Sequence, residues 1–409
     1  MARHSHRSSG VAHFPQLRLT RPQSISPLWK SEMQLTEEQL MIRDTARNFA
    51  QSELAPNADE WERAGNVPQD VLRKMGEIGL MGVVVPVEWG GVGADFVSYA
   101  LALEEIAAGH AASSLYMSLN NSPNGLALTK YGTDAQKEAF LRPSAEGRLQ
   151  AVFALTEPHT GSDASNLKTR AEKVGNKWVI NGSKQFISSG ESGAYCLLFA
   201  VTDPEAGKKG ISAFLTPTDA AGYTVVAKED KMGQRASDLC QLAFEDLEIA
   251  PDMMLGEEGQ GYRIALENLT TGRIGIAAQS IGIARAALEC ARDYAKEREA
   301  FGKVIIEHQA VGHRLADMAT QVEAARHLML HAARLYDADG GGLVEASMAK
   351  LFASEMAEKV CSDAVQTLGG YGYVGGFPAE RYFRDVRVCK IYEGTSDVQR
   401  MLIARSLAA

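Results

Sequence analysis

The chain has 409 residues, of which 45% are hydrophobic and 23% are charged, proportions typical of soluble globular proteins. Its formal net charge of −9 at pH 7 argues against nucleic acid as the main partner, because phosphate binding needs clustered positive charge. Such a length predicts two or three domains, and no uninterrupted apolar run approaches the roughly 18 residues that would span a bilayer.

Residues 1–32 are interpreted as an extension. They are rich in Arg and Ser and poor in acids, a composition that resembles a transit peptide. Three prolines weaken any amphipathic helix there, and Met33 followed by QLTEEQ is equally typical of a natural start with a helix cap at Thr36. The expected compartment depends on whether residues 1–32 are a transit peptide or the chain starts naturally at Met33. Bacterial cytoplasm is favoured, and the mitochondrial matrix is the alternative.

The rest of the chain predicts three domains. Residues 33–150 carry apolar positions at helical spacing and predict an N-terminal α-helical domain. Residues 151–255 contain short segments rich in β-branched and aromatic residues, separated by Gly, Asn and Pro, and predict an antiparallel β domain. Residues 256–409 predict a C-terminal helical bundle with long helices near 262–301, 307–338 and 344–368. In the second of these helices, apolar residues recur at alternating steps of four and three, namely Val311, Leu315, Met318, Val322, Ala325 and Met329.

Several common sites are disfavoured. The order α, β, α lacks the βαβ units of a Rossmann fold. A GxGxxG match at Gly370, Gly372 and Gly375 follows a predicted helix rather than a strand, so it is interpreted as a helix end and loop. The five cysteines form no CxxC pair and no HExxH occurs, so no metal site is predicted.

Near the C-terminus, IYEGTSDVQR places Glu393 between Tyr392 and Gly394. The residue types around Glu393 leave two interpretations of this carboxylate open. Glu393 could be a surface residue in a turn capped by Thr395. It could instead be a base whose pKa is raised by apolar walls, such as Ile391 and Tyr392, so that it removes a substrate proton without competition from water.

Six motifs occur in chain order, namely VPVEWGGVG, LTEPHTGSD, NGSKQFIS, REAFGK, QTLGGYGY and IYEGTSDVQR. Together they resemble the acyl-CoA dehydrogenases over residues 33–409, and most closely the short-chain, butyryl-CoA-type members. The resemblance implies that family's fold, an α-helical domain, a β domain and a C-terminal four-helix bundle. It also implies FAD as cofactor and a homotetramer.

In the family the flavin lies between the β domain and the bundle. The implied contacts from one subunit are Phe153, Leu155, Thr156, Phe186, Ser188, Thr395 and Asp397. The residues implied to reach the adenosine-diphosphate part from a neighbouring subunit are Arg298, Phe301, Gln309, Gln366, Gly369 and Gly370. Phe186 and Ser188 stand where Trp and Thr are frequent, and keep an aromatic face and a hydroxyl. Asp397 stands where Glu or Gln is frequent.

The resemblance also implies the mechanism. Glu393 would remove the α-proton of an acyl-CoA while the β-hydrogen leaves as hydride to flavin N5, which yields a trans-2-enoyl-CoA. The backbone N–H of Glu393 and a flavin hydroxyl would stabilise the charge on the thioester oxygen. Ser162 matches a contact to the CoA chain, Arg273 a position near the thioester cavity, and Gly394 leaves its backbone open to substrate.

The choice of substrate and acceptor rests on finer features. Isovaleryl-specific relatives place the base one residue before the bundle arginine, where this chain has Gly272, so that substrate is disfavoured. Saturated C4 to C6 esters are favoured, with medium or branched chains open, and an electron-transferring flavoprotein is the expected acceptor. The alternatives are a related FAD acyl-CoA oxidase or desulfinase and, more remotely, a DNA-associated flavoprotein of the same fold, for which the sequence lacks a basic character.

Overall fold

A computed structural model of the chain describes residues 35–408, so the expected extension, residues 1–32, lies outside the described residues. The first part of the described chain is helical, as predicted, and its first helix begins directly after Thr36. Its helices are α1 (Glu37–Phe49), α2 (Ala58–Ala64), α3 (Gln69–Glu77), α4 (Phe96–Gly109), α5 (Ala111–Asn121), α6 (Asn124–Tyr131), α7 (Asp134–Gln136) and α8 (Arg142–Ala145).

The strands that follow form one sheet in the order β6-β7-β3-β2-β4-β5-β8, with β1 added beside β4. They are β1 (Ala151–Ala154), β2 (Arg170–Val174), β3 (Lys177–Ser188), β4 (Tyr195–Val201), β5 (Ile211–Pro217), β6 (Tyr223–Lys228), β7 (Leu239–Ile249) and β8 (Met254–Leu255). The prediction of an antiparallel domain needs correction, because β1 runs parallel to β4 and β2 meets β4 in parallel. A tight hairpin enforces the antiparallel direction only between strands that it joins, and the β2–β3 hairpin separates β1 from β4.

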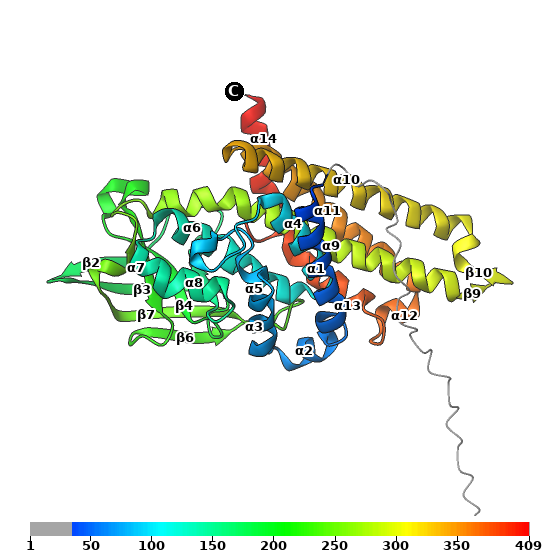
Figure 1. Cartoon of the computed structure of the whole chain (residues 1–409), viewed down its shortest axis with the longest axis horizontal. Coiled ribbons are helices and arrows are strands. Elements are labelled where there is room, and N and C mark those ends of the chain that lie inside the picture. The colour runs from blue at the N-terminus through cyan, green and yellow to red at the C-terminus, as the bar shows by residue number, and fades with distance from the viewer. Residues whose placement is uncertain (1–34, 409) are drawn as a thin grey trace, which may run out of the picture. The chain divides into compact units, whose positions relative to one another are not determined.

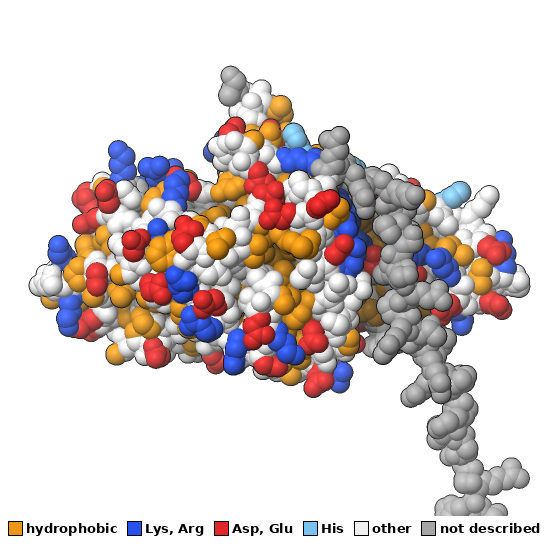
Figure 2. Space-filling model, viewed as in Figure 1, with side chains coloured by type: hydrophobic (Ala, Val, Ile, Leu, Met, Phe, Trp, Pro, Cys, Tyr) orange, Lys and Arg blue, Asp and Glu red, His pale blue; other side chains and the backbone are white. Residues whose placement is uncertain are grey.

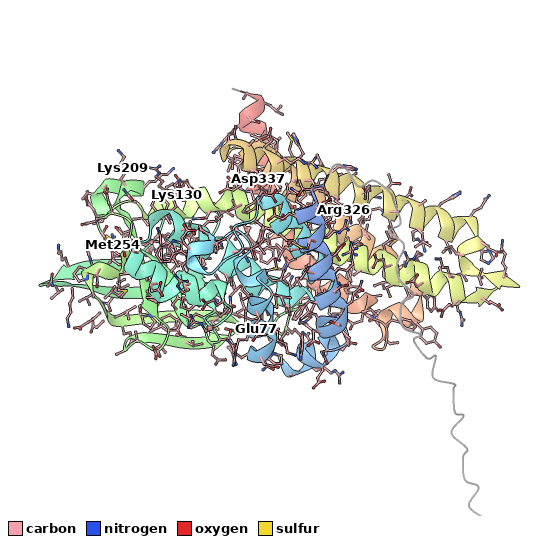
Figure 3. All side chains as sticks on the ribbon, in the orientation of Figure 1. Glu77, Lys130, Lys209, Met254, Arg326 and Asp337 are labelled. Atoms are coloured by element: carbon pink, nitrogen blue, oxygen red, sulfur yellow. The ribbon has the colours of Figure 1, made fainter. Side chains whose placement is uncertain are left out.

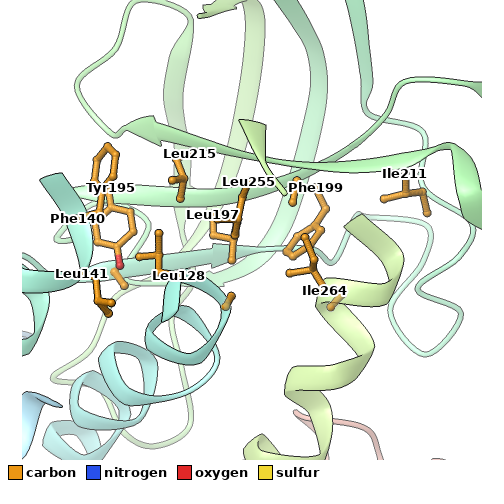
Figure 4. Packing of buried hydrophobic residues seen from close by; sticks show 14 of the residues in the cluster. Leu128, Phe140, Leu141, Tyr195, Leu197, Phe199, Ile211, Leu215, Leu255 and Ile264 are labelled. Carbon is orange, nitrogen blue, oxygen red and sulfur yellow. The ribbon is translucent and has the colours of Figure 1, made fainter. Parts of the chain in front are cut away.

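Successive side chains of β4 fill two different cores, because neighbouring residues of a strand point to opposite faces. Leu197 and Phe199 pack against the helices on one face, where Figure 4 shows them with Leu128 and Ile264. Cys196, on the other face, packs in a second core with residues of β3 and β7. Each fully buried Leu or Phe side chain contributes roughly 1.5–3 kcal/mol relative to exposure, so this strand anchors both layers.

The last part of the chain is helical again. Its elements are α9 (Gly261–Glu297), the hairpin β9 (Glu299–Ala300) and β10 (Lys303–Val304), α10 (Gln309–Asp339), α11 (Leu343–Leu368), α12 (Gly370–Tyr373), α13 (Ala379–Val386), the 3-10 turn η8 (Arg387–Lys390) and α14 (Ser396–Leu407). Figure 1 shows α10 and α11 beside α9. The predicted seam of α10 is buried at Leu315, Met318 and Val322 and half-buried at Val311, which confirms the bundle.

Within residues 35–408, α9 is the one helix that is long and apolar enough to cross a membrane by length and composition. The sequence of α9 contains no uninterrupted apolar run of that length, because polar residues are scattered along the helix. However, 78% of its most apolar window is buried inside the protein. Burial of this kind is that of a core helix in a soluble protein.

The N-terminal helices and the bundle share polar contacts across the interior. Glu104 of α4 accepts hydrogen bonds from Arg326 of α10 at 2.6 Å and from Arg285 of α9 at 3.0 Å. Asp337, near the end of α10, accepts from the backbone N–H of Phe96 at 2.7 Å and thereby caps the first turn of α4. Figure 3 labels Arg326 and Asp337 along α10. These contacts place α4 against the bundle.

Candidate active site

Glu393 lies in the short turn between η8 and α14 and points into the bundle. Its backbone φ is 54°, and that of Gly394 is 87°, so two consecutive residues adopt the left-handed conformation. This conformation is rare for a residue with a side chain. The carboxylate lies over Gly272 of α9, where an added methyl group would stand 2.6 Å from Oε2. The turn and its Thr395 cap are present as one interpretation expected, but Glu393 is half-buried and its carboxylate lies against α9, so the surface placement is not supported.

The surroundings of the carboxylate change its titration. Burial raises the pKa of Glu393 above its ordinary value, and the positive charges of Arg273 and Lys350 partly offset that rise. Arg273 is itself buried, and its Nε and Nη1 have no hydrogen-bond partner within residues 35–408. A buried guanidinium with open donors beside a carboxyl group that protonates easily is typical of a functional site.

Two buried side chains hold the turn. Lys350 of α11 donates from Nζ to the carbonyl oxygen of Gly394 at 2.7 Å. Gln399 of α14 donates from Nε2 to the same oxygen at 2.9 Å and to the carbonyl oxygen of Glu393 at 3.2 Å. Left-handed backbone costs about 1–3 kcal/mol at a non-glycine residue, and these hydrogen bonds compensate for it.

Thr395 caps the helix that follows this turn. Its Oγ1 accepts a hydrogen bond from Val398 N at 3.3 Å, at the first turn of α14. Asp397, on the same turn, has a side chain that is 92% exposed and pairs with Arg400 at 3.1 Å. The assignment of Asp397 to the flavin therefore gains no geometric support, whereas Thr395 stays next to Glu393.

The residues predicted for the flavin of the same subunit come from the ends of β1 and β3. The carbonyl oxygen of Thr156 accepts from Gln185 N at 2.9 Å, which joins the segment after β1 to β3. Phe186 follows, 59% exposed and with a φ of 57°. Leu155 and Ser188 are half-buried. An exposed aromatic ring held in left-handed backbone next to two hydroxyl-bearing residues is a surface suited to a planar, hydrogen-bonding ligand.

Not every member of that set presents a free face. Phe153 is half-buried and packs against Phe199 of the sheet core, with ring centroids 5.0 Å apart. Ser162, predicted to contact the CoA chain, lies exposed in the loop after β1. Both residues stay predictions.

A buried ion pair supports the segment after β1. Lys184 donates from Nζ to Glu157 Oε1 at 2.9 Å and to the carbonyl oxygen of Leu155 at 3.0 Å, and both charged side chains are almost fully buried. Glu157 also accepts from the backbone N–H of Lys168 at 2.6 Å and of Thr169 at 3.0 Å. Burial lowers the pKa of Lys184 to about 8, although the charge of Glu157 acts in the opposite direction.

Replacing Lys184 with methionine should lower the free energy of unfolding by about 3–5 kcal/mol, because it leaves the charge of Glu157 buried without its partner. Urea denaturation followed by circular dichroism measures this change. The matched control is Lys177→Met, whose exposed pair with Glu248 contributes no more than about 1 kcal/mol. A loss for Lys184→Met as small as that of the control would contradict a structural role for the pair.

Only some of the residues predicted to reach the cofactor of a neighbouring subunit lie together. Arg298, Gly369 and Gly370 line one cavity of about 470 Å³. A methyl group built on either glycine would meet nothing within 4 Å, so the backbone is open to close approach. Phe301, on the β9–β10 hairpin, is 97% exposed with a φ of 52°.

Gln309 and Gln366 are exposed outside the lining of this cavity. A larger cavity of about 1260 Å³ lies between α2, the segment before β7 and α13, and no residue predicted for the active site lines it. No group of three or more His, Cys, Asp or Glu side chains in residues 35–408 is arranged to hold a metal ion.

Sequence reasoning missed three residues of the site, namely Lys350, Gln399 and Lys184. For Lys350 a signal exists, because it falls on the helical face of Ala346, Ala353 and Ala357, all of which are buried. A lysine on an apolar stripe indicates a buried charge. For Gln399 and Lys184 no comparable pattern exists. The partners of Lys184, Glu157 and the carbonyl oxygen of Leu155, lie more than 25 residues away in the chain, and the hydrogen bonds of Gln399 to the Glu393–Gly394 turn depend on the folded backbone.

Three family models match the chain. They describe the acyl-CoA dehydrogenase N-terminal domain over residues 36–148, the middle domain over residues 152–247 and the C-terminal domain over residues 259–408. The chain belongs to the acyl-CoA dehydrogenase family. It is therefore an oxidoreductase that dehydrogenates acyl-CoA. The predicted fold class is confirmed, with the sheet mixed rather than antiparallel throughout.

Curated relatives in this family cover nearly the whole chain. An acyl-CoA dehydrogenase of Bacillus subtilis is 46% identical over 92% of this chain and 99% of its own length. The mitochondrial short-chain specific acyl-CoA dehydrogenase of Bos taurus is 45% identical over 92% of this chain and 91% of its own length. A subunit of the caffeyl-CoA reductase-Etf complex of Acetobacterium woodii is 42% identical, over 92% and 99%.

Solved acyl-CoA dehydrogenase structures share the fold. Butyryl-CoA dehydrogenase from Megasphaera elsdenii is 39% identical, with a TM-score of 0.89 over 92% of this chain and 99% of that one. A chain of the structure described as the electron transferring flavoprotein of Acidaminococcus fermentans is 44% identical, with a TM-score of 0.90 over 92% and 99%. Glutaryl-CoA dehydrogenase from Mycobacterium smegmatis in complex with FADH2 is 29% identical, with a TM-score of 0.87 over 91% and 95%.

Proposed function

We propose that this acyl-CoA dehydrogenase uses FAD to convert a short-chain saturated acyl-CoA, of C4 to C6, to the trans-2-enoyl-CoA, with Glu393 as the base that removes the α-proton. The observation that carries the proposal is the placement of the Glu393 carboxylate against Gly272, where burial raises its pKa. A carboxylate with a raised pKa is a stronger base than one with the ordinary pKa of an exposed glutamate.

The backbone of Glu393 supports the same chemistry. Its N–H has no acceptor within residues 35–408, although the turn that contains it is held by Lys350 and Gln399. A fixed and unpaired N–H donor can stabilise the negative charge that develops on the thioester oxygen as the α-proton leaves. In the substrate, the thioester oxygen and the α-carbon are bonded to the same carbonyl carbon. In the protein, the N–H donor and the base belong to the same residue, Glu393.

The residues present fit FAD. Phe186 offers an exposed ring and Thr156 and Ser188 offer hydroxyl groups, while Gly369 and Gly370 leave open backbone beside Arg298. An arginine fork suits a pyrophosphate. The flavin, when bound, accepts the hydride from the β-carbon. The protein residues orient the ester, exclude water and remove the α-proton.

We further propose a homotetramer that passes its electrons to an electron-transferring flavoprotein. The predicted cofactor residues fall into separate groups, one around β1 and β3 and one around Arg298, and the second group would serve a neighbouring subunit. Phe301 at 97% and Tyr373 at 83% exposure are large apolar side chains that a neighbour or ligand would cover. A relative from a caffeyl-CoA reductase-Etf complex and a similar chain from a structure described as an electron transferring flavoprotein support the electron acceptor. Bacterial cytoplasm is the proposed compartment, with the mitochondrial matrix as the alternative.

Anaerobic titration of the purified protein with butyryl-, hexanoyl-, octanoyl- and isovaleryl-CoA tests cofactor, reaction and chain length together. We expect the flavin absorbance to bleach most completely with the C4 and C6 esters. Stronger bleaching by octanoyl- or isovaleryl-CoA would contradict the proposed chain length, and an absence of bleaching with all four would contradict the reaction.

A related acyl-CoA oxidase or desulfinase is the alternative that shares the framework. An oxidase would turn over with oxygen as well as with an electron-transferring flavoprotein, and a desulfinase would release sulfite from a sulfinated thioester, so acceptor and product assays separate them.

For a DNA-associated flavoprotein, a broad basic face is the expected feature. Figure 2 shows acidic and basic side chains interspersed over the face in view.

A further inference from the structure

We propose that Lys350 is a positioning residue for the base, one that holds the Glu393–Gly394 turn through its hydrogen bond to the Gly394 carbonyl oxygen. The proposal rests on the proposed function, in which Glu393 removes the α-proton. Lys350 is fully buried on α11, and its one hydrogen bond within the described residues is the 2.7 Å contact to Gly394 O.

The fold gives Lys350 no evident structural reason to be charged. Its neighbours on the same face of α11 are Ala346, Ala353 and Ala357, each fully buried, and a buried cation costs free energy unless it is paired. It has no carboxylate within salt-bridge distance in residues 35–408. A methionine would fill similar space without that cost. The charge and the donor therefore point to the turn that Lys350 contacts.

The contact fixes the direction of the base. Glu393 and Gly394 both have positive φ, at 54° and 87°, and only this backbone directs the carboxylate at Gly272. Lys350 and Gln399 converge on the Gly394 carbonyl oxygen from different helices. If Lys350 is lost, Gln399 still satisfies that oxygen, so the fold keeps its hydrogen bond but the turn loses one of its two anchors.

The charges around Lys350 determine the pH dependence. Arg273 of α9 and Glu393 face it across the site, Cys389 approaches from η8, and Glu355 lies on the same helix. Burial lowers the pKa of Lys350 to about 8 and the charge of Arg273 acts in the same direction, while the charges of Glu393 and Glu355 act to raise it. Lys350 is thus cationic at neutral pH, and its charge holds the pKa of Glu393 below the value that burial alone would give.

The test compares Lys350→Met and Lys350→Arg with the wild type, with Lys359→Met as the control. Lys359 lies on the same helix, is exposed and pairs with Asp363 at 2.6 Å. The base must be deprotonated, so kcat/KM rises with pH through the pKa of Glu393. Lys350→Met removes a nearby positive charge, and we expect this limb to move upward by about one pH unit or more. Lys350→Arg should restore the limb, and Lys359→Met should leave it unchanged.

A second measurement does not depend on turnover. Hydrogen exchange of the peptide that contains Gly394 and Thr395 should be faster in Lys350→Met than in the wild type, because the turn has lost an anchor. The urea midpoint should stay the same or rise, since a buried unpaired cation has been removed. Should Lys350→Met fail to fold, Lys350→Gln removes the same charge and carries the same expectations.

The outcomes separate this inference from the proposed function. A pH limb and an exchange rate that match the wild type in Lys350→Met would overturn the positioning role, even if Glu393→Gln is inactive. Wild-type flavin reduction in Glu393→Gln would overturn the proposed base, and the exchange rate would still decide whether Lys350 holds the turn. A shifted limb, faster exchange and rescue by arginine would support both proposals.

Discussion

Glu393→Gln should abolish most of the dehydrogenation, with a loss in the rate of flavin reduction on the order of 10²–10⁴-fold or more, as the removal of a general base predicts. The amide keeps the size of the side chain and can remain over Gly272, but it cannot accept the α-proton. Bound FAD and the urea midpoint should be unchanged, because Glu393 side-chain oxygens support no other element in the described residues. Stopped-flow mixing with butyryl-CoA under anaerobic conditions measures the rate.

The control is Glu248→Gln, on an exposed stretch of β7, which should reduce flavin at the wild-type rate. The pH profile adds a second check. Since burial raises the pKa of Glu393 above its ordinary value, the wild-type limb should lie above the range of an exposed glutamate, and the residual rate of Glu393→Gln should lack this limb. A variant that keeps both the rate and the limb would remove Glu393 from the mechanism.

Gly272→Ala should lower kcat by about 10²-fold while the protein remains as stable as the wild type. The added methyl group would stand 2.6 Å from Oε2 and 2.9 Å from Cδ of Glu393, and its three nearest atoms all belong to that carboxyl group. The carboxylate must therefore move, and a displacement of about 1 Å from a reacting geometry costs about 10²-fold. Alanine within a helix is favoured over glycine by about 1 kcal/mol, which opposes any loss of stability.

A double-mutant cycle with Glu393→Asp isolates this contact. The shorter side chain leaves room at Gly272, so Gly272→Ala should cost far less in the Asp background than alone, and the two effects should not add. Steady-state kcat with butyryl-CoA and thermal denaturation are the measurements. Additive effects, or a fall in stability equal to the fall in rate, would show that the methyl group acts elsewhere.

Much of the fold could be predicted from local patterns, because helical spacing and turn residues are properties of short segments. The expected helices near 307–338 and 344–368 agree with α10 (Gln309–Asp339) and α11 (Leu343–Leu368) within two residues. The direction of β1 could not be predicted, since it depends on which distant strand β1 meets.

The candidate site divides in the same way. The motif that contains Glu393 marked the residue, but its left-handed backbone and its contact with Gly272 arise from residues far apart in the chain that meet only in the folded bundle. Lys350 shows most clearly which features the sequence can predict and which it cannot. Its place on an apolar helical face indicates burial, yet nothing in the neighbouring sequence indicates that its ammonium group meets the carbonyl oxygen of Gly394.

The contacts of Glu104 and Asp337 bear on how the protein unfolds. Both join α4 to helices that are synthesised much later, and Glu104 satisfies the guanidinium groups of Arg285 and Arg326 at once. A truncated protein that began at the strands would leave these two arginines with only Glu289 and Glu323, on their own helices, as partners. We therefore expect the first and last thirds of the chain to unfold together, because loss of α4 would remove Glu104, the carboxylate that both guanidinium groups share.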